Sequence, residues 1–313
     1  MTLGRWPMGI TRNVKKAEMV NDRTRRSVAL VTYDARPEPT DDDRLLVDAL
    51  AARGCSVHAV PWSRPTHWRA FDAVVVRSPW DYFHRSREFH GWLDDLQADG
   101  VPVHNDVRIL RWNADKSYLR ELESRGIAVI PTRWLDAGSA VTLGALRRES
   151  GWEELVVKPT VSGGAHRTWR ASPDAETTDE LRLAEMLEDG AVMVQPLVAE
   201  VERDGEWSLV FFDGTFSHAI LKRPRSGDFR VQREHGGTIE TAGPAPSVIA
   251  AAERALAAIP FRGAPPLYAR VDGCIVDGAL RLMELEVLEP ELFLRCAPES
   301  AERLAESLLA RMD

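Results

Sequence analysis

Two glutamates near the end of the chain have the spacing of a pair that could hold a hard metal ion. If Met283 to Glu286 forms a strand, its side chains alternate between two faces, so the two glutamates share one face while Met283 and Leu285 point into the core. Neighbouring carboxylates repel one another unless a cation lies between them, and Mg²⁺ prefers oxygen ligands of this kind. In the alternative interpretation, the two carboxylates pair with Arg270 and Arg281 and bind no metal.

A third carboxylate, Asp272, can join this pair in only one strand register. A two-residue turn at Asp277-Gly278 would place Asp272 opposite Met283, with its side chain on the wrong face. A three-residue loop, or an equivalent bulge, would place Asp272 opposite Glu284. The metal hypothesis, with Asp272, Glu284 and Glu286 as ligands, therefore requires the longer loop or a bulge.

A lysine at the end of a predicted strand could bind an anion together with the loop that follows it. Lys158 ends an apolar run and precedes Pro159, which cannot donate to a β-ladder. The small residues Ser162-Gly163-Gly164 can then bring backbone N–H groups close to a phosphate. The segment is not a P-loop, and taken alone it is better explained as an ordinary hairpin.

A basic stretch lies between this loop and the two glutamates. Lys222-Arg223-Pro224-Arg225 follows a predicted strand, and Arg230 belongs to a short extended run from Phe229 to Arg233. Near the carboxylates these side chains could bind phosphate, because the arginine guanidinium suits bidentate contacts. The alternative is a solvated basic loop.

A polar and aromatic segment follows the third predicted strand of the N-terminal region. It comes directly after Ala73–Val76 and combines a cation, an anion, a hydroxyl and two aromatic rings. In parallel sheets, ligands lie beyond the carboxyl ends of the strands. The segment is therefore either a substrate site or a turn whose aromatic rings cover the core. Its candidate residues are Arg77, Ser78, Trp80, Asp81 and Tyr82.

Strands and helices alternate from Val28 to His104, which predicts a small parallel sheet with helices on its faces. The predicted strands are short apolar runs rich in β-branched residues, and Gly54 marks the end of the first helix. The expected strands are Val28–Tyr33, Cys55–Val60, Ala73–Val76 and Val101–His104, and the expected helices are Asp41–Arg53 and Ser86–Ala98.

Two further lobes are expected after residue 112. The second contains a hairpin around the lysine loop and a helix from Asp179 to Leu187. The third is antiparallel, because Asp213-Gly214 and Asp277-Gly278 are strong hairpin signals between apolar runs. We therefore divide the chain into a disordered basic extension (1–26), an N-terminal substrate-side lobe (27–112), a lid lobe (113–195) and a C-terminal lobe with the metal-binding strands (196–313).

Composition argues against several classes of function. The net charge is -8, which gives no support for a nucleic-acid partner, and no apolar run reaches the length of a membrane span. The three cysteines are far apart and odd in number, which favours a reducing compartment over a disulfide framework. We therefore expect a cytoplasmic protein with a small-molecule substrate. The oligomeric state stays open, with a homodimer as one option.

The order of these motifs resembles the ATP-grasp superfamily, of the glutathione-synthetase and ribosomal-protein-glutamate-ligase type. The resemblance covers Val28 to Arg311 and rests on short motifs that follow one another in the family's order. These motifs are Asp115-Lys116, Val157-Lys158-Pro159 with its Ser-Gly-Gly loop, Val194-Gln195-Pro196-Leu197-Val198, Arg230 with Gly236-Gly237, and Arg270-Val271-Asp272 with Glu284-Leu285-Glu286.

This resemblance implies an ATP-grasp fold and a role for each matching residue. Lys116 and Lys158 would contact the ATP phosphates, under a lid formed by Ser162, Gly163 and Gly164. The hinge Gln195, Leu197 and Val198 would read adenine, Glu206 would lie near the ribose or the hinge, Asp272, Glu284 and Glu286 would hold two magnesium ions, and Arg230, Arg270 and Lys222 would be the catalytic cations.

Three segments are similar to a narrower group, the ATP-grasp cyclo-ligases that close O-ureido-D-serine to D-cycloserine. They are Arg77–Tyr82, Gly205–Leu209 and Met283–Pro290. The last segment departs from the wider superfamily, because it has Glu-x-Glu where Glu-x-Asn is common. The extra charge either strengthens metal binding or is balanced by Arg270.

The resemblance further implies an ADP-forming ligase that acts on an amino-acid-like substrate. A substrate carboxylate would attack the γ-phosphate of ATP, and an amine would then displace phosphate from the acyl phosphate, with water excluded by the lid. The amine belongs either to the same molecule or to a second amino acid or peptide. A non-catalytic nucleotide-binding protein is a third alternative, which the joint presence of both lysines and all three carboxylates argues against.

Overall fold

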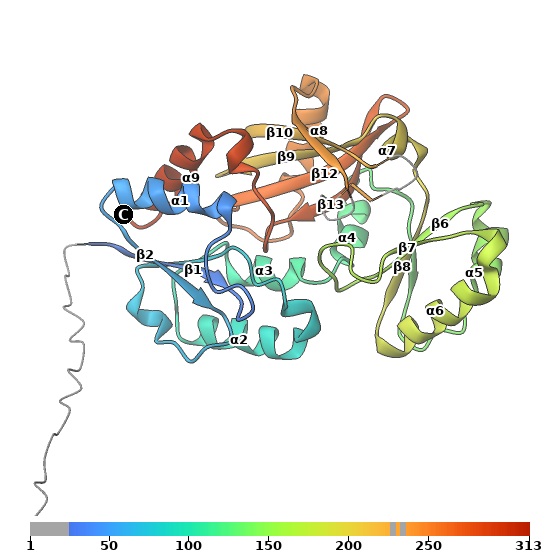
Figure 1. The fold of residues 1–313 in the computed structure, drawn as a ribbon, viewed down its shortest axis with the longest axis horizontal. Helices are drawn as coiled ribbons and strands as arrows, with labels where there is room; N and C mark the ends of the chain where they lie inside the picture. The colour runs from blue at the N-terminus through green and yellow to red at the C-terminus, as the bar shows by residue number, and fades with distance from the viewer. Residues whose placement is uncertain (1–24, 226–229, 232–235) are drawn as a thin grey trace, which may run out of the picture.

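The computed structural model describes residues 25–225, 230–231 and 236–313. The predicted extension, residues 1–26, therefore lies almost entirely outside the described residues, as do Phe229 and Arg233 of the predicted extended run. Three β-sheets organise the described chain, one for each of the expected lobes (Figure 1).

The N-terminal lobe is a four-stranded parallel sheet in the order β2-β1-β3-β4, which confirms the prediction from strand–helix alternation. Its first helix begins at a cap, where the Thr40 hydroxyl accepts a hydrogen bond from the Asp43 backbone N–H at 3.0 Å. The elements are β1 Ser27–Thr32, α1 Asp41–Ala52, β2 Ser56–Pro61, η1 Trp68–Ala70, β3 Ala73–Val76, η2 Tyr82–His84, α2 Ser86–Ala98 and β4 Val103–His104.

The lid lobe is an antiparallel sheet in the order β5-β8-β6-β7. The predicted hairpin around Lys158 is confirmed as β6 and β7. The core is made of apolar side chains from this sheet and from two helices, separate from the cores of the other lobes. The elements are β5 Arg133–Leu135, α5 Leu143–Ser150, β6 Leu155–Pro159, β7 Trp169–Ala171, η3 Pro173–Ala175, α6 Glu176–Asp189 and β8 Val192–Pro196.

The C-terminal lobe is an antiparallel sheet in the order β11-β10-β9-β12-β13, as the two Asp-Gly turns predict. Both aspartates of these turns, Asp213 and Asp277, adopt the positive φ that such tight hairpins need. The elements are α7 Ala199–Arg203, β9 Glu206–Phe212, β10 Thr215–Arg223, β11 Thr238–Thr241, α8 Pro246–Ala257, β12 Tyr268–Val276, β13 Ala279–Glu286, η5 Leu294–Cys296 and α9 Glu299–Ala310.

Two short helices, α3 (Val107–Asn113) and α4 (Tyr118–Ser124), connect the first lobe to the lid. Helix α3 has no counterpart among the elements predicted from the sequence. The buried side chains of Tyr118 and Leu122 on α4 pack into the core of the C-terminal lobe, whereas the lid core begins at Leu135. The predicted lobe boundary at residue 113 thus precedes a segment that packs against the C-terminal sheet.

The N-terminal and C-terminal lobes share one core. Leu30 of β1 and Leu46 of α1 belong to the same buried cluster as Tyr268 of β12 and Leu304 of α9. Helices α1 and α9 lie side by side in Figure 1, while the lid stands at the opposite end of the molecule. These two lobes therefore form a common base, whereas the lid has a core of its own. None of the helices that the structure describes combines the length and apolar composition of a membrane span.

Candidate active site

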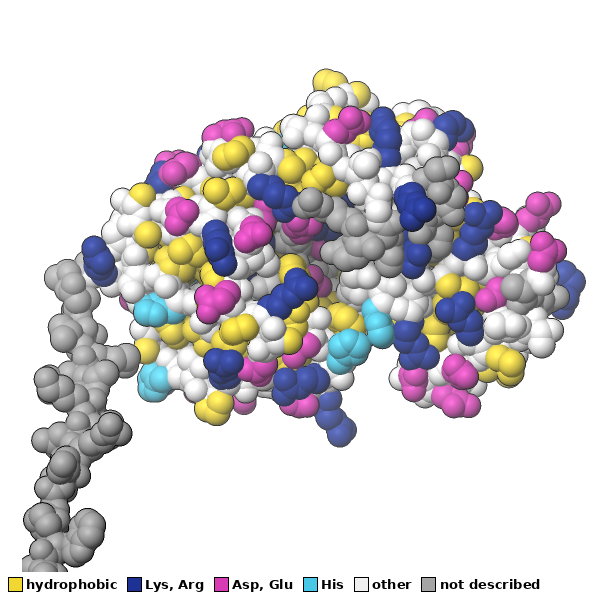
Figure 2. Space-filling model, viewed as in Figure 1, with side chains coloured by type: hydrophobic (Ala, Val, Ile, Leu, Met, Phe, Trp, Pro, Cys, Tyr) yellow, Lys and Arg dark blue, Asp and Glu magenta, His cyan; other side chains and the backbone are white. Residues whose placement is uncertain are grey.

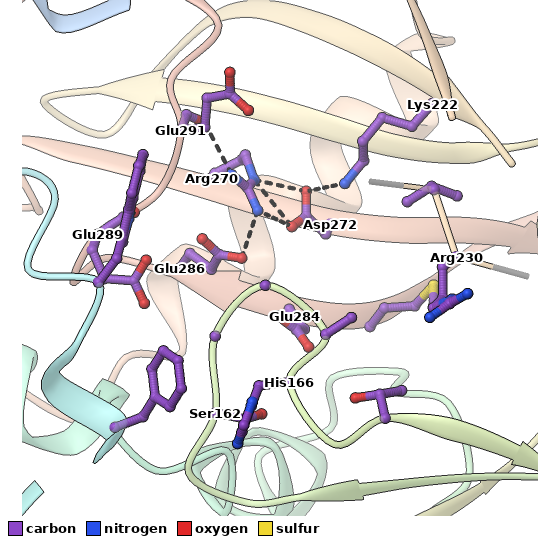
Figure 3. Close-up of a pocket in the computed structure, with 18 of the residues that line it drawn as sticks. Ser162, His166, Lys222, Arg230, Arg270, Asp272, Glu284, Glu286, Glu289 and Glu291 are labelled. Carbon is purple, nitrogen blue, oxygen red and sulfur yellow. Dashed lines mark hydrogen bonds and ion pairs between the residues drawn. The ribbon is translucent and has the colours of Figure 1, made fainter. Parts of the chain in front are cut away.

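One cavity of about 1220 Å³ lies where the three lobes meet. Every residue that sequence analysis assigns to the site lines this cavity, with the exception of Asp81. The cavity therefore brings together residues from distant parts of the chain. Figure 3 shows its acidic and basic side chains converging from the C-terminal sheet toward the lid loop.

Asp81 is turned toward the N-terminal core. Its carboxylate accepts a hydrogen bond from the indole N–H of Trp62 at 2.7 Å and lies 3.6 Å from the guanidinium of Arg85. Asp81 therefore lies outside the cavity lining, and its contacts hold the segment that carries Trp80 and Tyr82 in place. The prediction that Asp81 contacts substrate is not supported by this position.

The strand register that the metal hypothesis requires is present. Asp272 of β12 is paired with Glu284 of β13, and Arg270 is paired with Glu286. The connecting turn has only two residues, and the register shifts through a bulge between Asp272 and the next residue of β12. The predicted bulge is therefore confirmed.

The bulge also corrects one prediction. Met283 is the residue left without a partner on β12, since Gly273 pairs with Leu282 and Asp272 pairs with Glu284. Its side chain lines the cavity next to Glu284, whereas sequence analysis places it in the core. Strict alternation fails here because a bulge lets two consecutive side chains face the same side.

Arg270 lies between two of the three predicted metal ligands. Its guanidinium contacts the carboxylate of Asp272 at 2.8 Å and that of Glu286 at 2.5 Å, and its Nη1 donates to the Glu291 carbonyl at 3.0 Å. No ion pair joins Arg281 to either glutamate within the described residues. Of the two arginines in the alternative interpretation, only Arg270 therefore pairs with this carboxylate cluster.

Different charges surround the three carboxylates, and their pKa values diverge. Burial would raise the pKa of Asp272, but Arg270 and Lys222 outweigh it and lower the pKa to about 2. Burial likewise opposes the lowered pKa of Glu284, which the nearby lysines produce. Burial raises the pKa of Glu286 to about 8, opposed by Arg270 and assisted by the neighbouring carboxylates. Arg270 therefore offsets the burial of Glu286 only in part.

The donor set suits a hard divalent cation, because it consists of carboxylate oxygens on one face of two paired strands. As they stand, however, no three carboxylate, histidine or cysteine side chains in the described chain are grouped closely enough to hold a metal ion. Arg270 bridges two of the carboxylates, and Lys158 lies 3.4 Å from Glu284. For a metal to bind, Arg270 and Lys158 would have to give up some of their contacts with these carboxylates.

Lys222 joins a second buried cluster beside the first. Its ammonium group pairs with Glu206 and lies 3.6 Å from Asp272, and the Ser208 hydroxyl donates to the same aspartate. Burial raises the pKa of Glu206 even though Lys222 opposes the shift. The position of Glu206 on the cavity wall is compatible with its expected place near the ribose.

The two lysines predicted to contact phosphate reach the cavity from different elements. Lys158 ends β6, and Lys116 precedes α4, where its ammonium group donates to the backbone carbonyl of Ser162 at 2.7 Å and lies 3.3 Å from the Ser162 hydroxyl. The backbone N–H of Lys116 also donates to the carbonyl of Thr160 at 2.8 Å. Lys116 therefore holds the lid loop in place.

The lid loop contacts the N-terminal lobe as well. The ring centroids of His166 and Phe83 are 5.3 Å apart, and those of His166 and His84 are 4.8 Å apart. Figure 2 shows histidine side chains next to each other where the lid meets the N-terminal lobe. A methyl group on Gly163 would lie 3.1 Å from the Phe83 ring. A glycine at this position therefore allows the loop to approach Phe83 closely.

The residues of the predicted adenine hinge line the cavity as well. The side chain of Gln195, at the end of β8, donates to the Thr132 hydroxyl at 2.9 Å. The Leu197 backbone N–H donates to the Glu154 carbonyl at 2.9 Å. Arg230 lies on the same side of the cavity as Lys222, away from Glu289 (Figure 3).

Arg77 and Ser78 line the substrate side of the cavity but are tied into the fold. Arg77 is buried, with its Nε 2.8 Å from the Asp43 carboxylate and its Nη2 donating to the Pro290 carbonyl at 2.8 Å. Ser78 is also buried, and its backbone N–H donates to the Val31 carbonyl at 3.0 Å. Both residues shape the substrate side of the cavity by fixing its walls.

Comparison with known proteins identifies the family of this chain. A model of the N-terminal domain of D-cycloserine synthetase DcsG matches residues 28–105. The cycloserine biosynthesis protein DcsG of Streptomyces lavendulae is 32% identical over 302 residues, which span 91% of this chain and 98% of that protein. The chain belongs to the DcsG family.

Solved structures agree with this assignment and identify the fold. The crystal structure of D-cycloserine synthetase DcsG superposes on the chain with a TM-score of 0.82 at 32% identity, covering 92% of this chain and 100% of that one. D-alanine–D-alanine ligase from Bacillus anthracis gives 0.68 at 16% identity, covering 92% and 97%. A RimK domain ATP-grasp protein from Sphaerobacter thermophilus gives 0.66 at 20% identity, covering 90% and 98%. This DcsG-family chain therefore has the ATP-grasp fold and is an ATP-dependent ligase that forms C–N bonds.

Some cavity residues of this DcsG-family member are absent from the set predicted from the sequence. Glu289 and Phe83 both line the cavity, and so do Glu291 and Arg295, which pair with one another at 2.5 Å. Glu289 belongs to the segment Met283–Pro290 that carries the narrower resemblance, yet no periodic pattern distinguishes it because it lies beyond the end of β13. Phe83 directly follows the predicted substrate segment and could have been found by extending that segment by one residue.

Proposed function

We propose that this chain is a magnesium-dependent cyclo-ligase that closes O-ureido-D-serine to D-cycloserine. The observation that carries the proposal is the match of residues 28–105 to the N-terminal domain of D-cycloserine synthetase. This lobe supplies the substrate side of the cavity, including Trp80, Tyr82 and Phe83. A sequence match in this lobe supports a shared substrate more directly than the fold does, because D-alanine–D-alanine ligase shares the fold over 92% of this chain at only 16% identity.

In the first step, the cations of the cavity position ATP for phosphorylation of the substrate carboxylate. Lys116 and Lys158 hold the phosphates of ATP, and the lid loop at Ser162 covers them. The substrate carboxylate attacks the γ-phosphate, which yields an acyl phosphate and ADP. In this proposal Arg270 and Arg230, which both line the cavity, offset the charge that develops on the transferring phosphoryl group.

The carboxylates Asp272, Glu284 and Glu286 would hold magnesium when ATP is bound. The incoming phosphates attract Lys158 away from Glu284 and so free this carboxylate. A magnesium ion held there would offset the charge of the phosphate oxygens, while Arg270 orients Asp272. We further propose that the three carboxylates hold two ions.

Ring closure follows within the same molecule. The nitrogen bonded to the side-chain oxygen of the substrate attacks the acyl carbon, and phosphate leaves. One water molecule then hydrolyses the carbamoyl group on that nitrogen, which releases carbon dioxide and ammonia. The contact between the lid and Phe83 keeps other water away from the acyl phosphate until the nitrogen has attacked.

Product analysis tests this function. The protein is incubated with ATP, Mg²⁺ and O-ureido-D-serine, and nucleotides and D-cycloserine are separated by chromatography with mass detection. We expect ADP, phosphate and D-cycloserine in equal amounts, and no product from Glu284→Gln. AMP and pyrophosphate would rule out the acyl-phosphate route. ADP release that depends on a pair of amino acids, without D-cycloserine, would instead identify a ligase that joins two separate molecules.

A further inference from the structure

The backbone around Glu289 is fixed from several directions. The Asn113 side chain accepts hydrogen bonds from the backbone N–H groups of Val287 at 2.8 Å and Leu288 at 3.1 Å. On the other side, Arg77 donates to the Pro290 carbonyl at 2.8 Å. Glu289 therefore stands on a rigid support, which is what a side chain needs in order to recognise a ligand with little loss of entropy.

Glu289 makes no ion pair with another described residue. Among the carboxylates that line the cavity, those of the β12–β13 face pair with Arg270 or a lysine, and Glu291 pairs with Arg295. No lysine or arginine of the described chain forms an ion pair with Glu289, although the side chain is half-buried. Burial of this carboxylate raises its pKa to about 7, despite Lys116 and Arg270. A half-buried carboxylate of this kind is stabilised when a cation binds beside it.

Aromatic side chains surround this carboxylate. The Tyr82 hydroxyl interacts with the carboxylate itself, and the Trp80 indole lies 3.4 Å from the Glu289 carbonyl. Phe83 lines the cavity next to Tyr82, with ring centroids 5.8 Å apart. The faces of aromatic rings attract ammonium groups and repel carboxylates. An anionic group beside aromatic rings therefore selects a compact cation.

The position of Glu289 in the cavity agrees with such a role. Figure 3 shows Glu289 on the side opposite Lys222 and Arg230, with Glu286 between them. A substrate that places an ammonium group at Glu289 can therefore direct its other end past Glu286 toward Lys222 and Arg230, two of the cations expected to act in catalysis. This is the polarity of an amino acid whose carboxylate is to be phosphorylated.

We propose that Glu289 binds the ammonium group of the substrate, within an aromatic pocket formed by Trp80, Tyr82 and Phe83. The assignment rests on the proposed function, because it takes the substrate to be amino-acid-like. It goes further by stating which end of the cavity receives the amine. Glu289 would then be the residue that makes the protein bind amino acids more tightly than acids without an amine.

Binding measurements on two ligands and three proteins test the assignment. The ligands are O-ureido-D-serine and its analogue without the α-amino group, 3-(ureidooxy)propanoate, titrated calorimetrically in the presence of ADP and Mg²⁺. The proteins are the wild type, Glu289→Gln and Glu38→Gln. Gln retains the volume and one acceptor oxygen, and Glu38 is an exposed carboxylate on the cavity rim, so its variant is the matched control.

We expect the wild type and the Glu38→Gln variant to bind the amine-bearing ligand about 10- to 100-fold more tightly than the analogue, as the loss of a charge-assisted hydrogen bond predicts. Glu289→Gln should bind both ligands about equally, with its affinity for ADP and its Mg²⁺ requirement unchanged. A Glu289→Gln variant that still prefers the amine would overturn the assignment. The assignment would also be overturned if Glu289→Gln needed more Mg²⁺ and still preferred the amine-bearing ligand, because Glu289 would then be a metal ligand.

The test separates this assignment from the proposed function. Tight, amine-dependent binding without formation of D-cycloserine would support the role of Glu289 and refute the cyclo-ligase. Formation of D-cycloserine with equal binding of both ligands by the wild type would refute the role of Glu289 and leave the cyclo-ligase standing. Absence of binding of either ligand to the wild type would count against both.

Discussion

Asp272 on β12 lies directly opposite Glu284 on β13, although the turn between their strands has only two residues. The register is restored by a bulge at Met283, which has no partner on β12. A regular strand would place Met283 opposite Asp272 and turn Glu284 into the apolar core. One additional residue therefore brings both Met283 and Glu284 to the cavity.

Met283 should contribute to ATP binding. It packs beside Ile130, Val198 and Val201 in a small apolar cluster next to the hinge. We expect Met283→Ala to raise the KM for ATP roughly tenfold, because the substitution removes apolar surface that would otherwise contact the base. The KM for the amino-acid substrate should change less. Met283→Leu, which conserves the volume, should behave almost as the wild type in steady-state kinetics, and an equal loss in both variants would contradict this role.

Arg270 should stabilise the fold, whereas Arg281 should not. Arg270→Met leaves Asp272 and Glu286 without their shared cation, so we expect the free energy of unfolding to fall by about 3 kcal/mol. Part of the loss should be regained with Mg²⁺, which can take the place of the guanidinium. Urea denaturation with and without Mg²⁺ measures both effects. Arg281→Met is the control and should lie within about 0.5 kcal/mol of the wild type.

The contact between Gly163 and Phe83 should limit access of water. A methyl group at Gly163 would lie 3.1 Å from the Phe83 ring, and the loop would have to move away. We expect Gly163→Ala to release more ADP per molecule of ligated product, because water then reaches the acyl phosphate. Adding Phe83→Leu should restore part of the coupling. Gly243→Ala, at a glycine with open space around it, is the control. An unchanged ratio of ADP to product in Gly163→Ala would show that the contact does not govern closure.

His104 should make the protein sensitive to acid. Burial, assisted by Arg311, lowers the pKa of His104 from 6.5 to about 4. The unfolded chain therefore takes up a proton near pH 6.5, but the folded chain does so only near pH 4, so stability is full above pH 6.5 and falls as the pH drops through this window. Between pH 7 and pH 5 the loss from this residue should be about 2 kcal/mol.

Denaturant titrations at several pH values measure this loss. His104→Gln should show a smaller dependence on pH than the wild type between pH 7 and pH 5. The exposed His67 provides the control, since His67→Gln should retain the slope of the wild type. Equal slopes in wild type and His104→Gln would contradict the prediction.

The amino-acid sequence by itself determines most of the elements and much of the site. The buried strand Ala73–Val76 and helix Ser86–Ala98 have the predicted bounds, because apolar periodicity and end signals act locally. Lys158 and the Ser162–Gly164 loop are recognisable because a lysine before a proline and two glycines is itself a local arrangement. Short strands such as β5 lack this signal, since three residues acquire their structure only by pairing with β8.

Tertiary structure decides which side chains face the cavity and what charge they carry there. Asp81 and Trp80 are neighbours in the sequence, yet the first is held by Trp62 while the second lines the cavity. The role of Glu289 is equally invisible to periodicity, because the side chain follows the end of a strand and its surroundings come from residues far away in the chain. At the Met283 to Glu286 run, the alternation of side chains predicts a shared carboxylate face. Only the pairing of β13 with β12 introduces the bulge that selects Asp272 as the partner of Glu284, since a register is a property of two strands and not of one.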